Sequence, residues 1–239
     1  MTMHIYSGPL SMFGAKVEIA AREKGVPFEL TMVPFTKDDA YEPKHPEVLR
    51  VNPVKQQVPV LTDSSDDTDR VESGVGGVGG VALFDSTQIF EYLEDRYPAP
   101  AHLALWPAGI AERARARQLE HQSDEVFFPN VIRLFGLQHD MKSAPAVAAC
   151  AACARFYETL EAQLATREYL AGPYSFADIA FYMACVFADR KGAGMTEATP
   201  RLLAWRERVG ARPAVRAVVD PMMRFLASQG RGVPTFLQR

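Results

Sequence analysis

The chain has few cysteines and no long apolar run, and both features limit what the protein can be. Three of its 239 residues are cysteines, and none of them precedes Cys150. An odd cysteine count without a secretory leader disfavours a disulfide framework. Cys150 and Cys153 match C-x-x-C, but they lie inside a helical pattern and are expected to be small buried thiols. The longest apolar run, residues 179–188, is about half of what a membrane span needs, so we expect a cytoplasmic protein.

The chain also lacks an excess of positive charge. It carries 26 Lys and Arg residues against 29 Asp and Glu residues, a formal net charge of -3. Partners such as nucleic acid or an anionic membrane favour a basic stripe, so neither is expected. The 48% hydrophobic and 23% charged fractions are those of an ordinary globular protein, and the length suffices for two modest domains.

The first hundred residues alternate between strand and helix patterns. Residues 3–7 and 28–33 have strand composition, and the helical spacing between them stops at Gly25 and Pro27. A Pro-punctuated connector covers residues 43–52, strands then begin at Val58 and Val81, and a helix follows over residues 86–96. This order predicts a β-α-β unit followed by β-β-α in a first domain of residues 1–98.

After a linker over residues 99–107 no strand pattern appears. Helical periodicity covers residues 110–137, 145–165, 175–189 and 200–210, and two shorter helices are expected after Pro213. Ser175 and Asp178 form a capping box before a segment that is apolar on every face, which predicts a buried central helix. Residues 108–239 are therefore predicted to form an all-helical domain.

Two features of the first domain indicate a binding site. Pro59 cannot donate to a strand ladder, so it lies at a strand's start or edge, and a cis Val58–Pro59 bond would expose the main chain of Val58. Asp85 and Ser86 begin a helix, where free N–H groups and the positive helix end favour a carboxylate.

This arrangement resembles the glutathione site of the glutathione S-transferase superfamily, and the resemblance extends over nearly the whole chain. The Ser175–Asp178 box, residues 200–205 and residues 211–214 are similar to parts of the family's helical domain. The resemblance implies a two-domain α+β/all-α fold, with a thioredoxin-like N-terminal domain and a C-terminal helical bundle. It also implies glutathione as co-substrate, a homodimer and no metal.

The resemblance identifies Ser11 as the residue that stabilises the glutathione thiolate. Ser11 stands six residues before Val17, a spacing similar to that of the serine-type, theta-like bacterial classes. Tyr6, at the end of the first strand, is the runner-up, because the tyrosine-type classes keep their hydroxyl near this point. The alternative for Ser11 is a plain N-cap of the first helix. The cysteine-type classes fit poorly because no cysteine precedes Cys150, and the isomerase-type (zeta-like) class is disfavoured because Ser-Ser-Cys is absent.

The other glutathione contacts follow from the same resemblance. The main chain of Val58, before cis-Pro59, pairs with the cysteinyl part of the tripeptide. Ser86 holds the γ-glutamyl carboxylate, Asp85 lies near the ligand amine, and Gln57 helps the glycyl end. The segment from residue 52 to residue 59 is one residue longer than the family usually has, which leaves the roles of residues 55–57 open.

The pocket for the second substrate and an unusual insert are less well defined. Candidate apolar liners of the pocket are Met12, Phe13, Phe35, Trp106, Phe127 and Phe128. In the insert, residues 63–80, the segment 74–79 matches the dinucleotide fingerprint but lacks its strand-then-helix setting. The aspartates there lack the rest of a calcium loop, so a long hairpin tip is the better interpretation.

The predicted activity is attack of the glutathione sulfur on a small electrophile, possibly a halogenated compound. Two alternatives stay open. One is glutathione-dependent reduction of a disulfide or peroxide at the same site. The other is a non-catalytic binding or regulatory protein that keeps the fold without turnover.

Overall fold

The computed structural model describes residues 3–64 and 80–238. By its internal contacts the chain divides into two compact units. The first comprises Met1–Leu103 with Ala217–Gln229, and the second comprises Ala104–Arg216 with Gly230–Arg239. The segment 74–79 and most of the insert lie outside the described residues.

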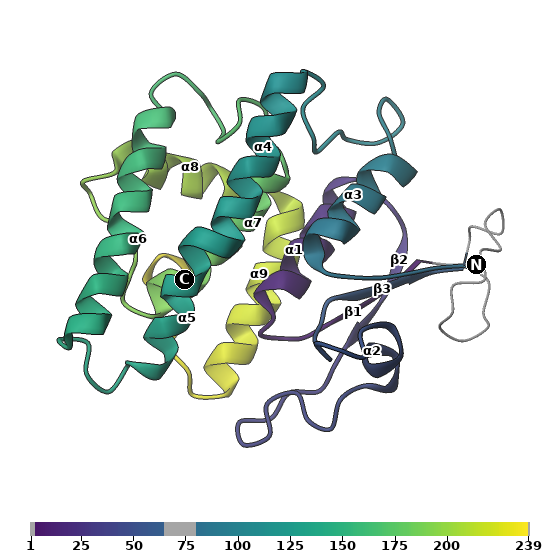
Figure 1. The fold of residues 1–239 in the computed structure, drawn as a ribbon, viewed down its shortest axis with the longest axis horizontal. Coiled ribbons are helices and arrows are strands. Elements are labelled where there is room, and N and C mark those ends of the chain that lie inside the picture. Colours follow the sequence, from purple (N-terminus) through teal and green to yellow (C-terminus); the bar gives the residue numbers. More distant parts are fainter. Residues whose placement is uncertain (1–2, 65–79, 239) are drawn as a thin grey trace. The chain divides into compact units, whose positions relative to one another are not determined.

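The first unit is built on a four-stranded sheet. Its elements are β1 (Met3–Ser7), α1 (Met12–Glu23), β2 (Phe28–Met32), α2 (Pro46–Val51), β3 (Val60–Asp63), β4 (Val81–Phe84) and α3 (Ser86–Arg96). The strand order is β2-β1-β3-β4, with β1 parallel to β2 and antiparallel to β3, and β3 antiparallel to β4. Helices α1 and α3 pack together on one face of the sheet, and α2 covers the other (Figure 1).

The side chains of β1 alternate between these two faces because successive residues of a strand point in opposite directions. Tyr6 belongs to a buried cluster with Val48 and Val51 of α2 and with Val60 of β3. Ser7 points to the other face, where its Oγ lies against α1.

Two local features of the first unit differ from the sequence-based expectation. The connector contains a helix, α2, whose N-cap His45 accepts a hydrogen bond from the Glu47 N–H. Strand β3 begins at Val60 rather than at Val58, because Pro59 has no N–H to donate. The Val58–Pro59 peptide bond is cis, as the family resemblance implied.

The described residues of the second unit form helices joined by loops, with one isolated β-bridge between Tyr169 and Gly172. It contains α4 (Ile110–Gln122), a π-helical segment (Ser123–Phe127), α5 (Phe128–Gly136), α6 (Ala144–Gln163), α7 (Phe176–Arg190) and α8 (Pro200–Gly210). The single helix expected over residues 110–137 is interrupted at the π-helical segment. Pro129 accounts for the break, since it lacks an N–H and its ring crowds the carbonyl four residues before it.

The C-terminal segment also differs from expectation. In place of two short helices it forms one long helix, α9 (Pro213–Ser228), with Pro221 inside it, and a short 3-10 turn at Thr235–Leu237. From Ala217 onward α9 belongs to the first unit.

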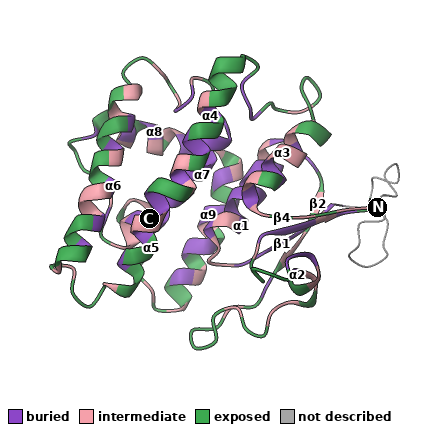
Figure 2. Cartoon of the chain, in the orientation of Figure 1, coloured by how far each residue is buried: buried purple, intermediate pink, exposed green. Residues whose placement is uncertain are grey.

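The core of the second unit is α7, which is buried on every face (Figure 2). The predicted capping box is present, with the Ser175 side chain and the Asp178 side chain each meeting the other residue's backbone. The two-domain fold expected from the sequence is therefore confirmed. In residues 3–64 and 80–238, no helix combines the length and the apolar character that a membrane crossing requires.

Candidate functional site

Ser11 lies in the turn that joins β1 to α1 and is the N-cap of α1. Its backbone is extended, with φ -88 and ψ 114, and its Oγ accepts a hydrogen bond from the Gly14 N–H at 2.9 Å. The turn is closed by a hydrogen bond from the Ser11 N–H to the Gly8 carbonyl at 3.0 Å. Since capping uses Ser11 only as an acceptor, its O–H proton remains available for donation. The capping role and a role toward a bound anion are therefore compatible.

Gly14 brings a second hydroxyl to the same place. A Cβ built on Gly14 would clash with the Ser7 Oγ and would lie 3.1 Å from the Ser11 Oγ. The Ser7 Oγ is buried and has no hydrogen-bond partner in the described part of the chain. The sequence analysis did not identify Ser7 as a site residue. The signal that could have identified it is a small polar residue at the end of an otherwise apolar strand.

Replacing Gly14 should therefore destabilise the protein through one identifiable contact. We expect Gly14→Ala to lower the free energy of unfolding by about 1–3 kcal/mol, because the new methyl overpacks the α1–β1 contact. Combining it with Ser7→Ala removes the clashing oxygen and should recover part of that loss in urea unfolding. Gly136→Ala is the control, since a Cβ there meets no atom within 4 Å. If the losses of unfolding free energy in Gly14→Ala and Ser7→Ala simply add in the double variant, the contact between position 14 and the Ser7 side chain is contradicted.

The side chain of Tyr41 contacts the same β1–α1 turn. Its Oη accepts a hydrogen bond from the Leu10 N–H at 3.0 Å, and a Cβ on Gly8 would clash with the Tyr41 ring. Sequence reasoning missed this residue because it lies 31 positions along the chain from Leu10.

Tyr6, the runner-up for Ser11, lies on the α2 side of the sheet. Its ring stacks on His4 with centroids 4.3 Å apart and lies 5.1 Å from the His45 ring. Burial raises the pKa of Tyr6 above its usual value, and the negative charge of Glu47 raises it further. The hydroxyl is thus a weaker acid than an exposed tyrosine.

The main chain of Val58 is available for pairing with a ligand. No hydrogen bond within residues 3–64 and 80–238 uses its N–H or its carbonyl. The loop before it is held by the buried Asn52, whose Nδ2 donates to the Gln57 carbonyl at 3.0 Å. Gln56, in this loop, has φ 53, in the left-handed region. The Gln57 side chain is exposed.

Asp85 and Ser86 begin α3 as the sequence predicted. Asp85 is the N-cap, and its Oδ1 accepts a hydrogen bond from the Thr87 N–H at 3.0 Å. Its φ of 75 is in the left-handed region, which is costly for a residue with a side chain, and strained residues of this kind cluster at active sites and ligand clamps. Ser86 is the first residue of the helix and is 3% exposed. Its hydroxyl therefore lies at the positive end of the α3 dipole.

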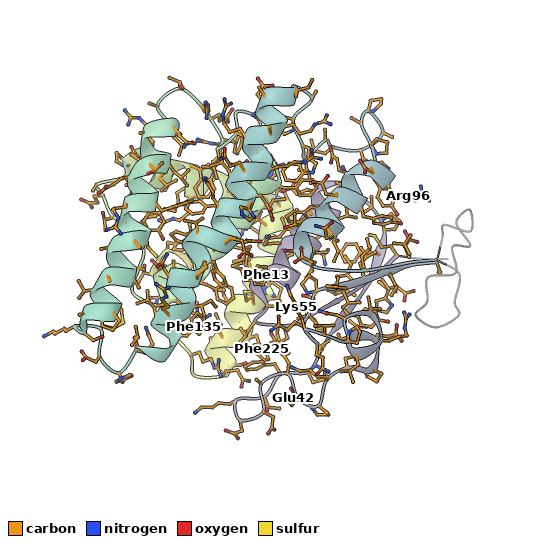
Figure 3. The ribbon with its side chains drawn as sticks, in the orientation of Figure 1. Phe13, Glu42, Lys55, Arg96, Phe135 and Phe225 are labelled. Atoms are coloured by element: carbon orange, nitrogen blue, oxygen red, sulfur yellow. The ribbon has the colours of Figure 1, made fainter. Side chains whose placement is uncertain are left out.

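The predicted liners of the second-substrate pocket are spread over both units. In the first unit Met12 is buried and Phe35 makes an edge contact with Phe225 of α9, with ring centroids 6.1 Å apart. Phe13 is half-buried on α1, and Figure 3 labels both Phe13 and Phe225. In the second unit Trp106 packs on Phe176 at 4.7 Å, and Phe128 lies 6.1 Å from Phe187. Phe127 contacts Phe156, Tyr157 and Phe181.

A cavity of about 610 Å³ lies within the first unit. We call it the α1–α9 cavity, because residues 15–22 of α1 and residues 217–225 of α9 line it together with β2 and Phe35. Among the predicted pocket residues only Phe35 lines it. Its walls are mostly apolar, and its size suits a small organic molecule.

The cysteines are free thiols. Burial raises the pKa of Cys150 and raises that of Cys153 to about 12, so neither forms a thiolate at neutral pH. Among the described residues no group of three His, Cys, Asp or Glu side chains is arranged to hold a metal ion.

Comparison with known proteins connects this geometry to a family. The family model for the glutathione S-transferase N-terminal domain matches residues 10–96, and that for the C-terminal domain matches residues 126–213. A probable glutathione S-transferase of rice (Oryza sativa subsp. indica) is 31% identical over 215 residues, covering 84% of this chain and 82% of the relative. The chain belongs to the glutathione S-transferase family.

Other glutathione S-transferases support the assignment. Glutathione S-transferase 3 of maize (Zea mays) is 30% identical over 227 residues, covering 91% of this chain and 93% of the maize protein. A glutathione transferase from Burkholderia graminis is 26% identical with a TM-score of 0.72, covering 92% of this chain and 88% of that one. That crystal structure contains two glutathione molecules per protein subunit.

Proposed function

We propose that this glutathione S-transferase binds glutathione in its first unit and activates the thiol for attack on a small electrophilic compound. The observation that carries the proposal is the Ser11 hydroxyl, whose oxygen accepts the Gly14 N–H while its proton stays free to be donated. An accepted hydrogen bond polarises the hydroxyl and makes it a better donor to a thiolate. The glutathione sulfur then forms a bond to the electrophilic carbon, and the leaving group departs with its electron pair.

The size of the Ser11 effect can be bounded. A free thiol has a pKa of about 8.5, so only a few per cent is thiolate at pH 7. A charge-assisted hydrogen bond of ~1.5–3 kcal/mol, with the helix N-terminus, lowers that pKa by about 2 units. The thiolate fraction rises about 25-fold, while intrinsic nucleophilicity falls about 8-fold. Most of the rate enhancement must then come from positioning the electrophile against the sulfur.

The remaining contacts in the proposal are distributed along the tripeptide. Val58, ahead of cis-Pro59, pairs through its free main chain with the cysteinyl residue. Ser86 binds the γ-glutamyl carboxylate at the α3 N-terminus, and Asp85 accepts from the ligand amine. Gln57 is the proposed partner of the glycyl end.

By family resemblance the proposed active form is a cytoplasmic homodimer. Analytical ultracentrifugation measures the mass of the assembly and so tests whether it is a dimer.

The test of this proposal is Ser11→Ala. We expect the pKa of bound glutathione, read from thiolate absorbance across a pH titration, to rise by about 2 units. The turnover of a chloronitrobenzene electrophile at neutral pH should fall by a few-fold or more, while calorimetric affinity for glutathione stays within about threefold. Tyr6→Phe is the control and should leave the thiol pKa unchanged, because Tyr6 packs in the cluster on the α2 side of the sheet.

Three outcomes would overturn parts of the proposal. Absence of any heat with millimolar glutathione removes glutathione as the ligand. Binding without turnover across a panel of electrophiles favours the non-catalytic alternative. A pKa shift in Tyr6→Phe instead of Ser11→Ala shows that the roles of the two hydroxyls were exchanged.

A further inference from the structure

The β1–α1 turn, residues 8–11, holds the backbone of Ser11 on both sides. The Ser11 N–H donates to the Gly8 carbonyl at 3.0 Å, and the Ser11 carbonyl accepts from the Ala15 N–H at 3.0 Å. The Ser11 Oγ accepts from the Gly14 N–H at 2.9 Å. With these contacts in place, the direction in which the Ser11 hydroxyl can donate its proton depends on how the turn itself is oriented.

The peptide group between Pro9 and Leu10 is the part of this turn that can rotate without breaking the hydrogen bond that closes it. The two common turn forms differ by a rotation of this group, and one of them requires a positive φ at the position of Leu10. Leu10 is not among the described residues with positive φ. Its N–H donates to the Tyr41 Oη at 3.0 Å, across 31 positions of the chain. Tyr41 therefore opposes rotation of the peptide group that precedes Ser11.

Tyr41 is itself fixed at this point of contact. A Cβ built on Gly8 would clash with the Tyr41 ring, so the ring lies directly against the turn. The ring also makes an edge contact with Phe35, with centroids 4.9 Å apart. In the loop before Tyr41, the Thr36 N–H donates to the Ala40 carbonyl at 2.9 Å, and Ala40 has φ 55. Such a backbone is costly for a residue with a side chain and persists where the surrounding structure enforces it.

We propose that Tyr41 is a positioning residue for the thiolate site. By accepting the Leu10 N–H and packing on Gly8, it fixes the orientation of the β1–α1 turn and thereby aims the Ser11 hydroxyl at the glutathione sulfur. This role rests on the proposed function, in which Ser11 donates to the thiolate. A hydrogen bond weakens steeply as its angle departs from linearity, so a turn that rotates loses part of the thiol pKa shift. Tyr41 acts through Ser11 and does not itself touch the sulfur.

The experiment is a double-mutant cycle that combines Tyr41→Phe with Ser11→Ala. Phenylalanine keeps the ring against Gly8 and removes only the acceptor oxygen. We expect Tyr41→Phe alone to raise the pKa of bound glutathione, read from thiolate absorbance, by about 0.5–1 unit, because one neutral hydrogen bond is lost. In the Ser11→Ala background the same change should move this pKa by less than about 0.2 unit, since no hydroxyl is left to aim.

Affinity and amide exchange separate positioning from a loss of structure. At about pH 5.5 the bound thiol is mostly protonated in both proteins, so the calorimetric affinity of Tyr41→Phe for glutathione should stay within about twofold of wild type. In the ligand-free protein, hydrogen exchange at the Leu10 N–H should become about five- to tenfold faster in Tyr41→Phe, because this N–H has lost its acceptor.

Tyr92→Phe is the matched control. The Tyr92 Oη donates to the Oδ2 of the buried Asp63 at 2.9 Å, and this bond joins α3 to β3. Neither residue belongs to the β1–α1 turn. The variant should lower the free energy of unfolding, since it removes a hydrogen bond from a buried carboxylate. It should leave the pKa of bound glutathione within about 0.2 unit of wild type and the Leu10 exchange rate unchanged.

Three results would overturn the role of Tyr41. They are an unchanged thiol pKa in Tyr41→Phe, an equal shift with and without the Ser11 hydroxyl, and an equally strong shift in Tyr92→Phe. Failure of the proposed function gives a different pattern, because Ser11→Ala then leaves the thiol pKa unchanged or glutathione does not bind. The Leu10 exchange rate needs no glutathione, and an unchanged rate in Tyr41→Phe contradicts the role of Tyr41 in either case.

Discussion

Asp178→Ala should lower the free energy of unfolding by about 3–5 kcal/mol, a large part of what holds a typical domain together. The carboxylate is fully buried at the start of α7 and accepts four hydrogen bonds. The donors are the Leu170 N–H at 3.0 Å, the Ser175 N–H at 2.9 Å, the Ser175 Oγ at 3.1 Å and the Trp205 Nε1 at 2.8 Å. Alanine leaves buried donors unpaired on three segments of the second unit. Urea unfolding followed by tryptophan fluorescence and by circular dichroism measures the loss.

Asp178→Asn separates charge from hydrogen bonding. Burial raises the pKa of Asp178 to about 6, although the four donors oppose the shift. Between pH 3.8 and about 6, the folded protein therefore keeps a proton on Asp178 that the unfolded chain has released. The contribution of this group to the free energy of unfolding is complete below pH 3.8, the pKa in the unfolded chain. It is lost as pH rises through about 6, the pKa in the folded protein. The stability of wild type minus that of Asp178→Asn should fall by roughly 2 kcal/mol between pH 4 and pH 7. A difference that is flat with pH would show that the carboxyl does not titrate in this range.

The sequence predicted those parts of the site that depend on local chemistry. Pro59 cannot donate an N–H wherever the chain places it, so its position immediately before β3 followed from its residue type. Asp85 and Ser86 are a helix start by composition, and Ser175 with Asp178 make a capping box at a fixed spacing. Each of these signals is carried by residues that lie within a few positions of one another in the sequence.

Features that depend on distant contacts were not predictable in the same way. Glu18 and Arg22 are an i,i+4 pair, which on sequence alone is a solvated helix surface. Only the fold buries Glu18 and gives it a place in a cavity. Tyr41 reaches the β1–α1 turn from a loop with no regular pattern. In each case the missing information is the tertiary position of the partner.

The helix boundaries that were missed have related causes. Helix α2 has six residues, too few for a hydrophobic period to stand out from its proline-rich surroundings. Residues 110–137 read as one helix because apolar spacing continues through the π-helical segment. Two shorter helices were expected after Pro213, yet α9 continues as one helix through Pro221. Periodicity thus locates helices but does not show where one bends or continues.

Ser86→Ala should weaken glutathione binding by on the order of 10- to 100-fold, the size expected for one charge-assisted hydrogen bond. Ser86 is the first residue of α3 and is buried, while Asp85 is the N-cap, so the change leaves the helix cap intact. The expected loss is therefore one of affinity and not of folding. Calorimetric titration of glutathione gives the dissociation constant, and thermal unfolding without ligand checks the fold. Gln88→Ala, at an exposed position of the same helix, is the control and should bind normally.

Asp85→Asn tests the neighbouring contact under the same conditions. Asparagine keeps a capping oxygen for the Thr87 N–H and tolerates the positive φ at this position, so only the negative charge is removed. We expect a smaller loss than in Ser86→Ala, and one that diminishes at high salt, because the contact is a charge interaction with the ligand amine. Unchanged affinity in both variants would show that the positive end of α3 does not hold the γ-glutamyl group. The strained backbone of Asp85 would then need another explanation, since strain of this kind persists only where the surrounding structure enforces it.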